Sequence, residues 1–164
     1  MRPLFWTAFW IFLIDQFSKY YVLHWLKLDQ VRYIDVMAPF LTFRMAWNKG
    51  VNFGLGAGYD MRWVLIGVAF AISIGAILWL WKAGGSRNTM IAGGLLIGGA
   101  MGNVVDRVIY GAVADFLNMS CCGIENPYAF NVADISIFAG AIGLAFLTDG
   151  GSSKPTKKSR AKRS

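Results

Sequence analysis

Four long apolar segments constrain this chain more than any other feature of its sequence. They cover residues 4–26, 63–81, 89–110 and 128–148. Each is close to the roughly 17–25 residues that a helix needs to cross a bilayer. Hydrophobic residues make up 56% of the chain and charged residues only 15%, whereas an ordinary soluble domain has about 25% charged residues. We therefore expect an all-α membrane protein with four transmembrane helices.

The distribution of Lys and Arg predicts the orientation of these helices. The N-terminus, the linker 82–88 and the tail 149–164 together hold nine Lys or Arg, and the opposite side holds five. Cytoplasmic segments carry the excess of positive charge in membrane proteins. Both termini are therefore expected in the cytoplasm. The first apolar segment is too long and too aromatic for a cleaved signal peptide.

The tail 149–164 accounts for most of the net charge of +7. Basic tails beside a membrane helix bind anionic lipid more often than nucleic acid. We expect residues 1–148 to form one transmembrane domain and 149–164 to form a disordered cytoplasmic tail, with membrane lipid as a partner and no nucleic acid.

Cysteine and histidine give little indication of a metal or redox site. Cys121 and Cys122 are adjacent, and neighbouring α-carbons lie ~3.8 Å apart, less than the roughly 4.4–6.8 Å usual in disulfides. Two unpaired thiols are therefore expected. His24 is the only histidine and there is no CxxC motif. We expect no metal and no cofactor.

The segment 27–62 is too long for a plain connection between helices. Residues 40–48 alternate in polarity, which is typical of a half-buried strand. Residues 48–50, Asn-Lys-Gly, indicate a turn, and glycines follow. The pattern predicts a small, curved extracytoplasmic sheet within 27–62, with a mobile loop near 48–58.

Small residues predict close packing of the third and fourth apolar segments. Gly94, Gly98 and Gly102 repeat at four-residue spacing, and residues 139–145 offer a matching Ala/Gly surface. Such spacing lets helix backbones approach closely in lipid. This packing would bring the outer ends of the two helices together.

Polar residues are concentrated near those outer ends. Asp15 and Lys19 are four residues apart on the first helix and are expected to form a structural ion pair. The remaining polar residues of interest come from the third and fourth segments and the chain between them: Asn103, Asp106, Arg107, Asp115, Asn131 and Asp134. Charge inside a membrane is costly, so each charged group needs a partner or a function.

Two carboxylates that share one proton can hydrolyse a peptide bond. One takes a proton from water while the other protonates the carbonyl oxygen. The spacing alone does not decide whether the catalytic pair is Asp106–Asp134 or Asp115–Asp134. Arg107 is expected to pair with a nearby carboxylate. This would leave Asp115, whose charge is less compensated, free to share a proton. A proton-coupled transporter subunit and a non-catalytic scaffold are the alternatives; a transporter would have its acids near the bilayer midplane.

Five motifs resemble those of the lipoprotein signal peptidase family, signal peptidase II, in the same order. They are DQFSK (15–19), NKGVNF (48–53), GGAMGNVVDR (98–107), VADF (113–116) and FNVAD (130–134). The resemblance implies an aspartyl endopeptidase of the bacterial inner membrane. It would remove the signal peptide from a prolipoprotein just before a cysteine that carries a diacylglyceryl group.

The resemblance also implies the roles of individual residues. Asp115 and Asp134 match the catalytic pair. The positions that match substrate-binding or site-shaping residues are Asn48, Gly50, Phe53, Asn103, Asp106, Arg107 and Asn131, and Asp15 and Lys19 match a structural pair. We expect a monomeric, multi-pass protein whose active site faces the periplasm and whose substrates are diacylglyceryl-modified prolipoproteins.

Overall fold

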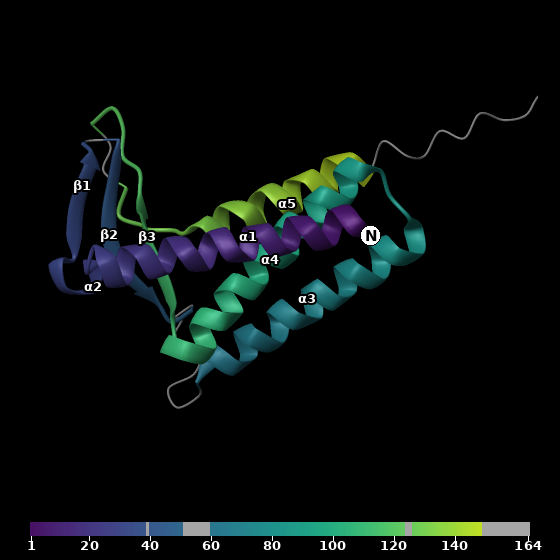
Figure 1. Ribbon diagram of the computed structural model, residues 1–164, viewed down its shortest axis with the longest axis horizontal. Coiled ribbons are helices and arrows are strands. Elements are labelled where there is room, and N and C mark those ends of the chain that lie inside the picture. Colours follow the sequence, from purple (N-terminus) through teal and green to yellow (C-terminus); the bar gives the residue numbers. More distant parts are fainter. Residues whose placement is uncertain (39, 51–59, 124–125, 149–164) are drawn as a thin grey trace, which may run out of the picture.

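The structure is a computed structural model that describes residues 1–38, 40–50, 60–123 and 126–148 (Figure 1). Its long helices coincide with the four apolar segments: α1 (Arg2–Tyr20), α3 (Met61–Ala83), α4 (Arg87–Tyr110) and α5 (Val132–Thr148). A π-helix (Tyr21–Trp25) prolongs α1, and the short helix α2 (Leu28–Val31) follows it. The small sheet lies at the end of the bundle opposite the N-terminus (Figure 1).

Capping residues set the ends of α3 and α4. The side chains of Asp60 and Ser86 accept hydrogen bonds from the backbone N–H groups of Arg62 and Thr89. These bonds satisfy donors that have no partner within the first turn of a helix. Gly111 ends α4 with φ +76, a left-handed conformation that glycine adopts without a steric penalty.

α4 is the central helix, because it contacts α1, α3 and α5. Both α3 and α4 are long and apolar enough to cross a bilayer, and α5 is a shorter apolar helix of 17 residues. Large apolar side chains are exposed on the outer faces of the bundle, including Phe17, Trp81 and Phe138. An apolar surface of this extent suits contact with lipid.

The glycine stripe of α4 packs against α1, which corrects the prediction that it packs against α5. A Cβ atom added at Gly94 or Gly98 would lie 2.6 Å from a backbone carbonyl oxygen of α1. One added at Gly102 would collide with the carboxylate of Asp15, also on α1. The spacing identified a face for close approach correctly, but it could not identify the neighbouring helix.

α4 and α5 do pack closely, through other residues. The ideal Cβ position at Gly99 of α4 collides with Ser136 of α5. Conversely, a Cβ added at Gly140 of α5 would lie 2.5 Å from the backbone nitrogen of Leu96 and 2.7 Å from the carbonyl oxygen of Ala92. The predicted packing of these helices, with the Ala/Gly face of 139–145 contributing, is therefore confirmed.

The sheet has three antiparallel strands in the order β1 (Tyr33–Met37), β2 (Leu41–Asn48) and β3 (Val113–Asn118). The first two strands lie inside 27–62 as predicted. The third comes from the chain after α4, so the prediction of a sheet confined to 27–62 was incomplete. In the register of β2 with β3, Ala46 lies opposite Asp115.

The predicted alternation of β2 is confirmed by its packing. Phe43 and Met45 contact an apolar cluster that includes Leu23, Leu28 and Phe116. Thr42 is buried on the other side, where its hydroxyl donates to Asn118 at 3.4 Å. The sheet is thus anchored through its apolar face to the π-helix and α2.

Two loop predictions have different outcomes. The turn at 48–50 is confirmed: Gly50 has φ +97, and its N–H donates to Oδ1 of Asn48 at 2.9 Å. The predicted mobile loop falls largely on residues 51–59, which lie outside the described residues.

The expectation of unpaired thiols is wrong. Cys121 and Cys122 form a disulfide in the exposed turn after β3, although the two residues are adjacent in the sequence.

Candidate active site

Backbone pairing holds the two candidate catalytic segments together. Leu117 of β3 and Phe130, just before α5, exchange hydrogen bonds of 2.8 and 2.9 Å. Asp115 lies two residues before Leu117, and Asp134 lies in the first turn of α5. β3 and the start of α5 therefore bring both carboxylates to the sheet end of the bundle.

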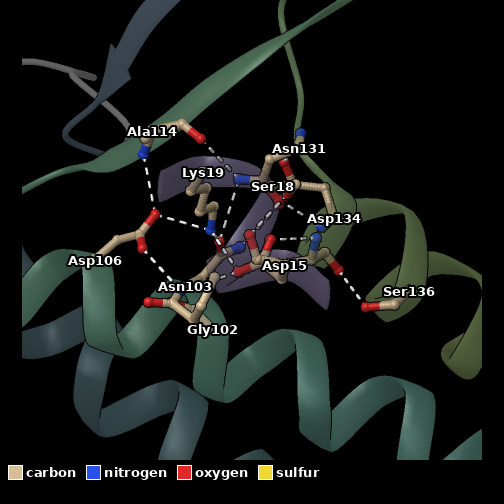
Figure 2. A network of polar contacts seen from close by, with 12 residues as sticks. Asp15, Ser18, Lys19, Gly102, Asn103, Asp106, Ala114, Asn131, Asp134 and Ser136 are labelled. Atoms are coloured by element: carbon tan, nitrogen blue, oxygen red, sulfur yellow. Dashed lines mark hydrogen bonds and ion pairs between the residues drawn. The ribbon is translucent and has the colours of Figure 1, made fainter. Parts of the chain in front are cut away.

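Asn131 connects the two carboxylates directly. Its Nδ2 donates to Oδ1 of Asp115 at 2.7 Å, and its backbone N–H donates to Oδ2 of Asp134 at 3.1 Å. Its Oδ1 accepts the backbone N–H of Asp134 at 2.9 Å. Because this acceptor role fixes the orientation of the amide, Nδ2 must face Asp115. Figure 2 shows Asn131 and Asp134 within this network.

Asn103 of α4 holds the second carboxylate. Its Nδ2 donates to Oδ1 of Asp134 at 2.9 Å. Its Oδ1 accepts from Nδ2 of Asn131 at 3.2 Å and from Nζ of Lys19 at 3.1 Å. Two donors on the oxygen leave the amide group only the orientation in which it donates to Asp134. Each candidate catalytic carboxylate therefore accepts a hydrogen bond from at least one asparagine side-chain amide.

The environment of Asp115 favours its protonated form. Burial, followed by the negative charge of Asp134, raises the pKa of the Asp115 carboxyl from 3.8 to about 7. Hydrogen bonds from Asn48 and Asn131 and the charge of Lys19 oppose this rise in the pKa. A carboxyl group whose pKa is near neutrality can act as a general acid or base.

Among the described residues, Arg107 forms no ion pair with a carboxylate, contrary to the prediction from the sequence. Its Nη1 donates to the backbone carbonyl of Asn103 at 3.2 Å. Its Nε is buried and has no hydrogen-bond partner among the described residues. A buried donor without an acceptor is costly, so a further acceptor is expected to approach this guanidinium.

Asp106 lies with Lys19 and Asp15 instead. Nζ of Lys19 is 2.8 Å from Oδ2 of Asp15 and 2.8 Å from Oδ2 of Asp106. The predicted pair Asp15–Lys19 is thus one part of a larger cluster, and Asp106, only 1% exposed, is withdrawn from the surface. Gln16, which sequence reasoning missed, places Nε2 at 3.1 Å from a carboxylate oxygen of each Asp. Gln16 could have been identified as a polar residue next to Asp15 in an otherwise apolar helix.

Two other predicted site positions fall near the start of the loop. Asn48 is exposed at the end of β2 and hydrogen-bonds to Asp115. Gly50 follows in the turn, and Phe53 lies outside the described residues. Within the described part of the chain, no group of three or more His, Cys, Asp or Glu side chains could hold a metal ion.

Solved structures of similar fold are bacterial membrane enzymes. Two structures described in these words superpose with TM-scores of 0.75 and 0.79, at 26% and 25% sequence identity. The first match covers 99% of this chain and 96% of the other, and the second covers 93% and 96%. The chain therefore has the fold of a bacterial membrane enzyme, with two aspartate carboxylates joined through Asn131 at its sheet end.

Sequence comparison identifies the family. The family profile for signal peptidase (SPase) II matches residues 7–148. The lipoprotein signal peptidase of Methylobacterium sp. (strain 4-46) is 42% identical over 149 residues, which cover 88% of each chain. That of Methylorubrum extorquens (strain PA1) is 46% identical over 113 residues, covering 66% of this chain and 63% of the relative. This chain belongs to the signal peptidase II family, whose members remove signal peptides from prolipoproteins.

Proposed function

We propose that Asp115 and Asp134 are the catalytic pair with which this chain hydrolyses a peptide bond of a prolipoprotein. The observation that supports this most directly is that Asn131 donates a hydrogen bond to each carboxylate. Neighbouring carboxylates cannot both ionise easily, so in the proposed mechanism the two share one proton.

The surroundings suggest how the two roles are divided. Asp134 accepts bonds from Nδ2 of Asn103 and the backbone N–H of Asn131, and such bonds favour a carboxylate. Asp134 would take the proton from water. Asp115, whose pKa is raised to about 7, would hold its proton and pass it to the scissile carbonyl oxygen. Water would attack the carbonyl carbon. The tetrahedral intermediate would then collapse as Asp134 passes its proton to the leaving nitrogen and Asp115 recovers a proton from the intermediate's hydroxyl group.

The substrate would bind at the sheet end of the bundle. A diacylglyceryl-modified cysteine keeps its acyl chains in the bilayer, so the adjacent peptide bond stays near the membrane surface. The unpartnered Nε of Arg107 could receive a substrate carbonyl. Asn48 and Gly50, at the edge of the same region, would contact the peptide, and Phe53 is proposed to do so by resemblance alone.

The proposed membrane arrangement has four crossings. α1 and α5 would cross beside α3 and α4, with both termini in the cytoplasm and the sheet on the periplasmic face of the inner membrane. The described end of α5 and the N-terminus lie at the same end of the bundle (Figure 1), which agrees with an even number of crossings. We propose a monomer in contact with lipid, with residues 149–164 as a cytoplasmic tail.

Cleavage of a lipidated prolipoprotein by purified variants tests this function. Asp115→Asn and Asp134→Asn should each lower turnover by about 10²–10⁴-fold, the typical contribution of an acid–base group. Asp35→Asn is the matched control, since Asp35 is exposed on β1 and should retain full activity. Near-normal turnover by either site variant would remove that residue from the catalytic pair, and Asp106 would be tested next.

A further inference from the structure

Three buried charged residues lie beside the proposed catalytic pair but take no part in its chemistry. Asp15, Lys19 and Asp106 are 0%, 3% and 1% exposed. We refer to them as the ion cluster. A buried ion group is retained only where its hydrogen bonds are well satisfied, and it is weak evidence for stability on its own.

The ammonium group of Lys19 is surrounded by polar groups of the chain itself. It has three N–H donors, and three acceptors surround it: Oδ2 of Asp15 at 2.8 Å, Oδ2 of Asp106 at 2.8 Å and Oδ1 of Asn103 at 3.1 Å. Its role must therefore be exerted through these partners.

Both carboxylates of the ion cluster also bind backbone N–H groups, and each of these groups belongs to the residue before a catalytic aspartate. Oδ1 of Asp15 accepts the N–H of Ala133 at 2.9 Å. Oδ2 of Asp106 accepts the N–H of Ala114 at 3.1 Å (Figure 2). Both alanines are fully buried. Each catalytic residue stands in the same tripeptide, Val-Ala-Asp.

We propose that the ion cluster is a positioning device that sets the separation of the two catalytic carboxylates. Lys19 draws Asp15 and Asp106 to one point, and these two carboxylates hold the backbone beside Asp134 and Asp115. The inference rests on the proposed function, because it assigns a role with respect to that catalytic pair. Lys19, Asp15 and Asp106 are positioning residues and contact neither water nor substrate in the reaction.

Two neighbouring residues complete this arrangement. Lys19 fixes the orientation of the Asn103 amide, which then donates to Asp134. Gly102 has no side chain, and a Cβ atom there would collide with the Asp15 carboxylate. The cluster thus connects α1 and α4 to both catalytic segments.

The test is the double variant Lys19→Met/Asp106→Asn. Methionine has nearly the length of lysine without its charge, and the second substitution keeps the net buried charge of the cluster at minus one. Oδ1 of the new Asn side chain can still accept the Ala114 N–H, so the variant removes the link through Lys19 and the bond that Gln16 donates to Asp106. Ser73→Ala is the control, because Ser73 is a buried polar residue of α3 remote in sequence from the cluster and its contacts.

We expect the double variant to fold, with kcat lowered at least tenfold and KM changed less than twofold on a lipidated prolipoprotein. A merely structural cluster would change the unfolding temperature and leave kcat of the folded fraction intact. Wild-type kcat, a rise in KM alone, or failure of the double variant to fold would each overturn the inference. Asp115→Asn is measured in parallel: its inactivity beside a fully active double variant would reject only the positioning role, whereas cleavage by Asp115→Asn would reject the proposed function.

Discussion

Replacing Gly98 with Ala should separate α1 from α4, because the two backbones meet at this residue. The new Cβ would lie 2.6 Å from the carbonyl oxygen of Ala8 and 3.0 Å from its Cα. Carbon and oxygen atoms in close helix contacts lie about 3.3–3.6 Å apart. The helices would therefore have to move apart by roughly 0.7 Å, the difference between the lower of these values and the ideal-Cβ distance.

The cost of this movement can be separated from the intrinsic preference for helix. Overpacking of this kind costs about 1–3 kcal/mol, whereas Gly→Ala in a helix is favourable by about 0.8–1.0 kcal/mol. Gly75 of α3 is the matched control, because no atom lies within 4 Å of its ideal Cβ position. The helix preference cancels between the two variants, so Gly98→Ala should be less stable than Gly75→Ala by about 1–3 kcal/mol.

Thermal unfolding in the same detergent measures this difference. For a chain of this size, 1 kcal/mol corresponds to roughly 2–4 °C, so the two midpoints should differ by several degrees, with Gly75→Ala at or above wild type. Equal midpoints for the two variants would refute the close approach of α1 and α4 at Gly98.

Three further predictions concern the site and the helix ends. Cleavage should decline as the pH rises through about 7, because loss of the Asp115 proton leaves both catalytic carboxylates ionised; initial rates between pH 5 and 9 check this, and an undiminished rate at pH 9 contradicts it. The raised pKa of Asp115 means that the folded state binds this proton more tightly than the unfolded state, so ionisation destabilises the protein as pH rises from about 4 to 7. Asp115→Asn should therefore unfold at a higher temperature than wild type at pH 8, with a smaller difference at pH 5, and a lower midpoint at pH 8 would argue against the burial penalty. Ser86→Ala should destabilise α4 by about 1 kcal/mol through loss of its cap. Thermal unfolding of Ser86→Ala and Ser73→Ala measures this, and identical midpoints for the two variants would show that the cap contributes nothing.

The helices could be predicted from sequence because lipid imposes one requirement along a whole segment. A segment such as 63–81 must be apolar over its full length, and within a bilayer a helix is the structure in which one segment satisfies all its own backbone groups. The strand β3 had no comparable signal. It has only six residues and nearly all are buried, so the alternation of a half-buried strand is missing. Asp115 could be placed near the end of α4, but not on a strand beside β2.

The sequence predicted the partner of a polar residue only where both residues lie on the same helix. Asp15 and Lys19 are four residues apart on one helix, and their pair could be predicted from this spacing. The contact of Lys19 with Asp106 joins different helices and depends on how α1 and α4 pack. The ion pair predicted for Arg107 with a nearby carboxylate likewise depended on packing, and Nη1 of Arg107 instead donates to the backbone carbonyl of Asn103. The same limitation assigned the glycine stripe to the wrong neighbour.

The balance of charge explains why a shared proton suits this site. Four carboxylates meet near the sheet end of the bundle: those of Asp15, Asp106, Asp115 and Asp134. Lys19 and Arg107 are the cations among the described residues that act on them. Full ionisation of the acids would leave two uncompensated negative charges in a region of low dielectric constant. Because Lys19 is already held between Asp15 and Asp106, the proton is retained most easily on the remaining pair, where Asp115 is the more buried member. In the proposed mechanism, the cluster that takes up Lys19 would therefore also leave Asp115 and Asp134 to share the proton that hydrolysis requires.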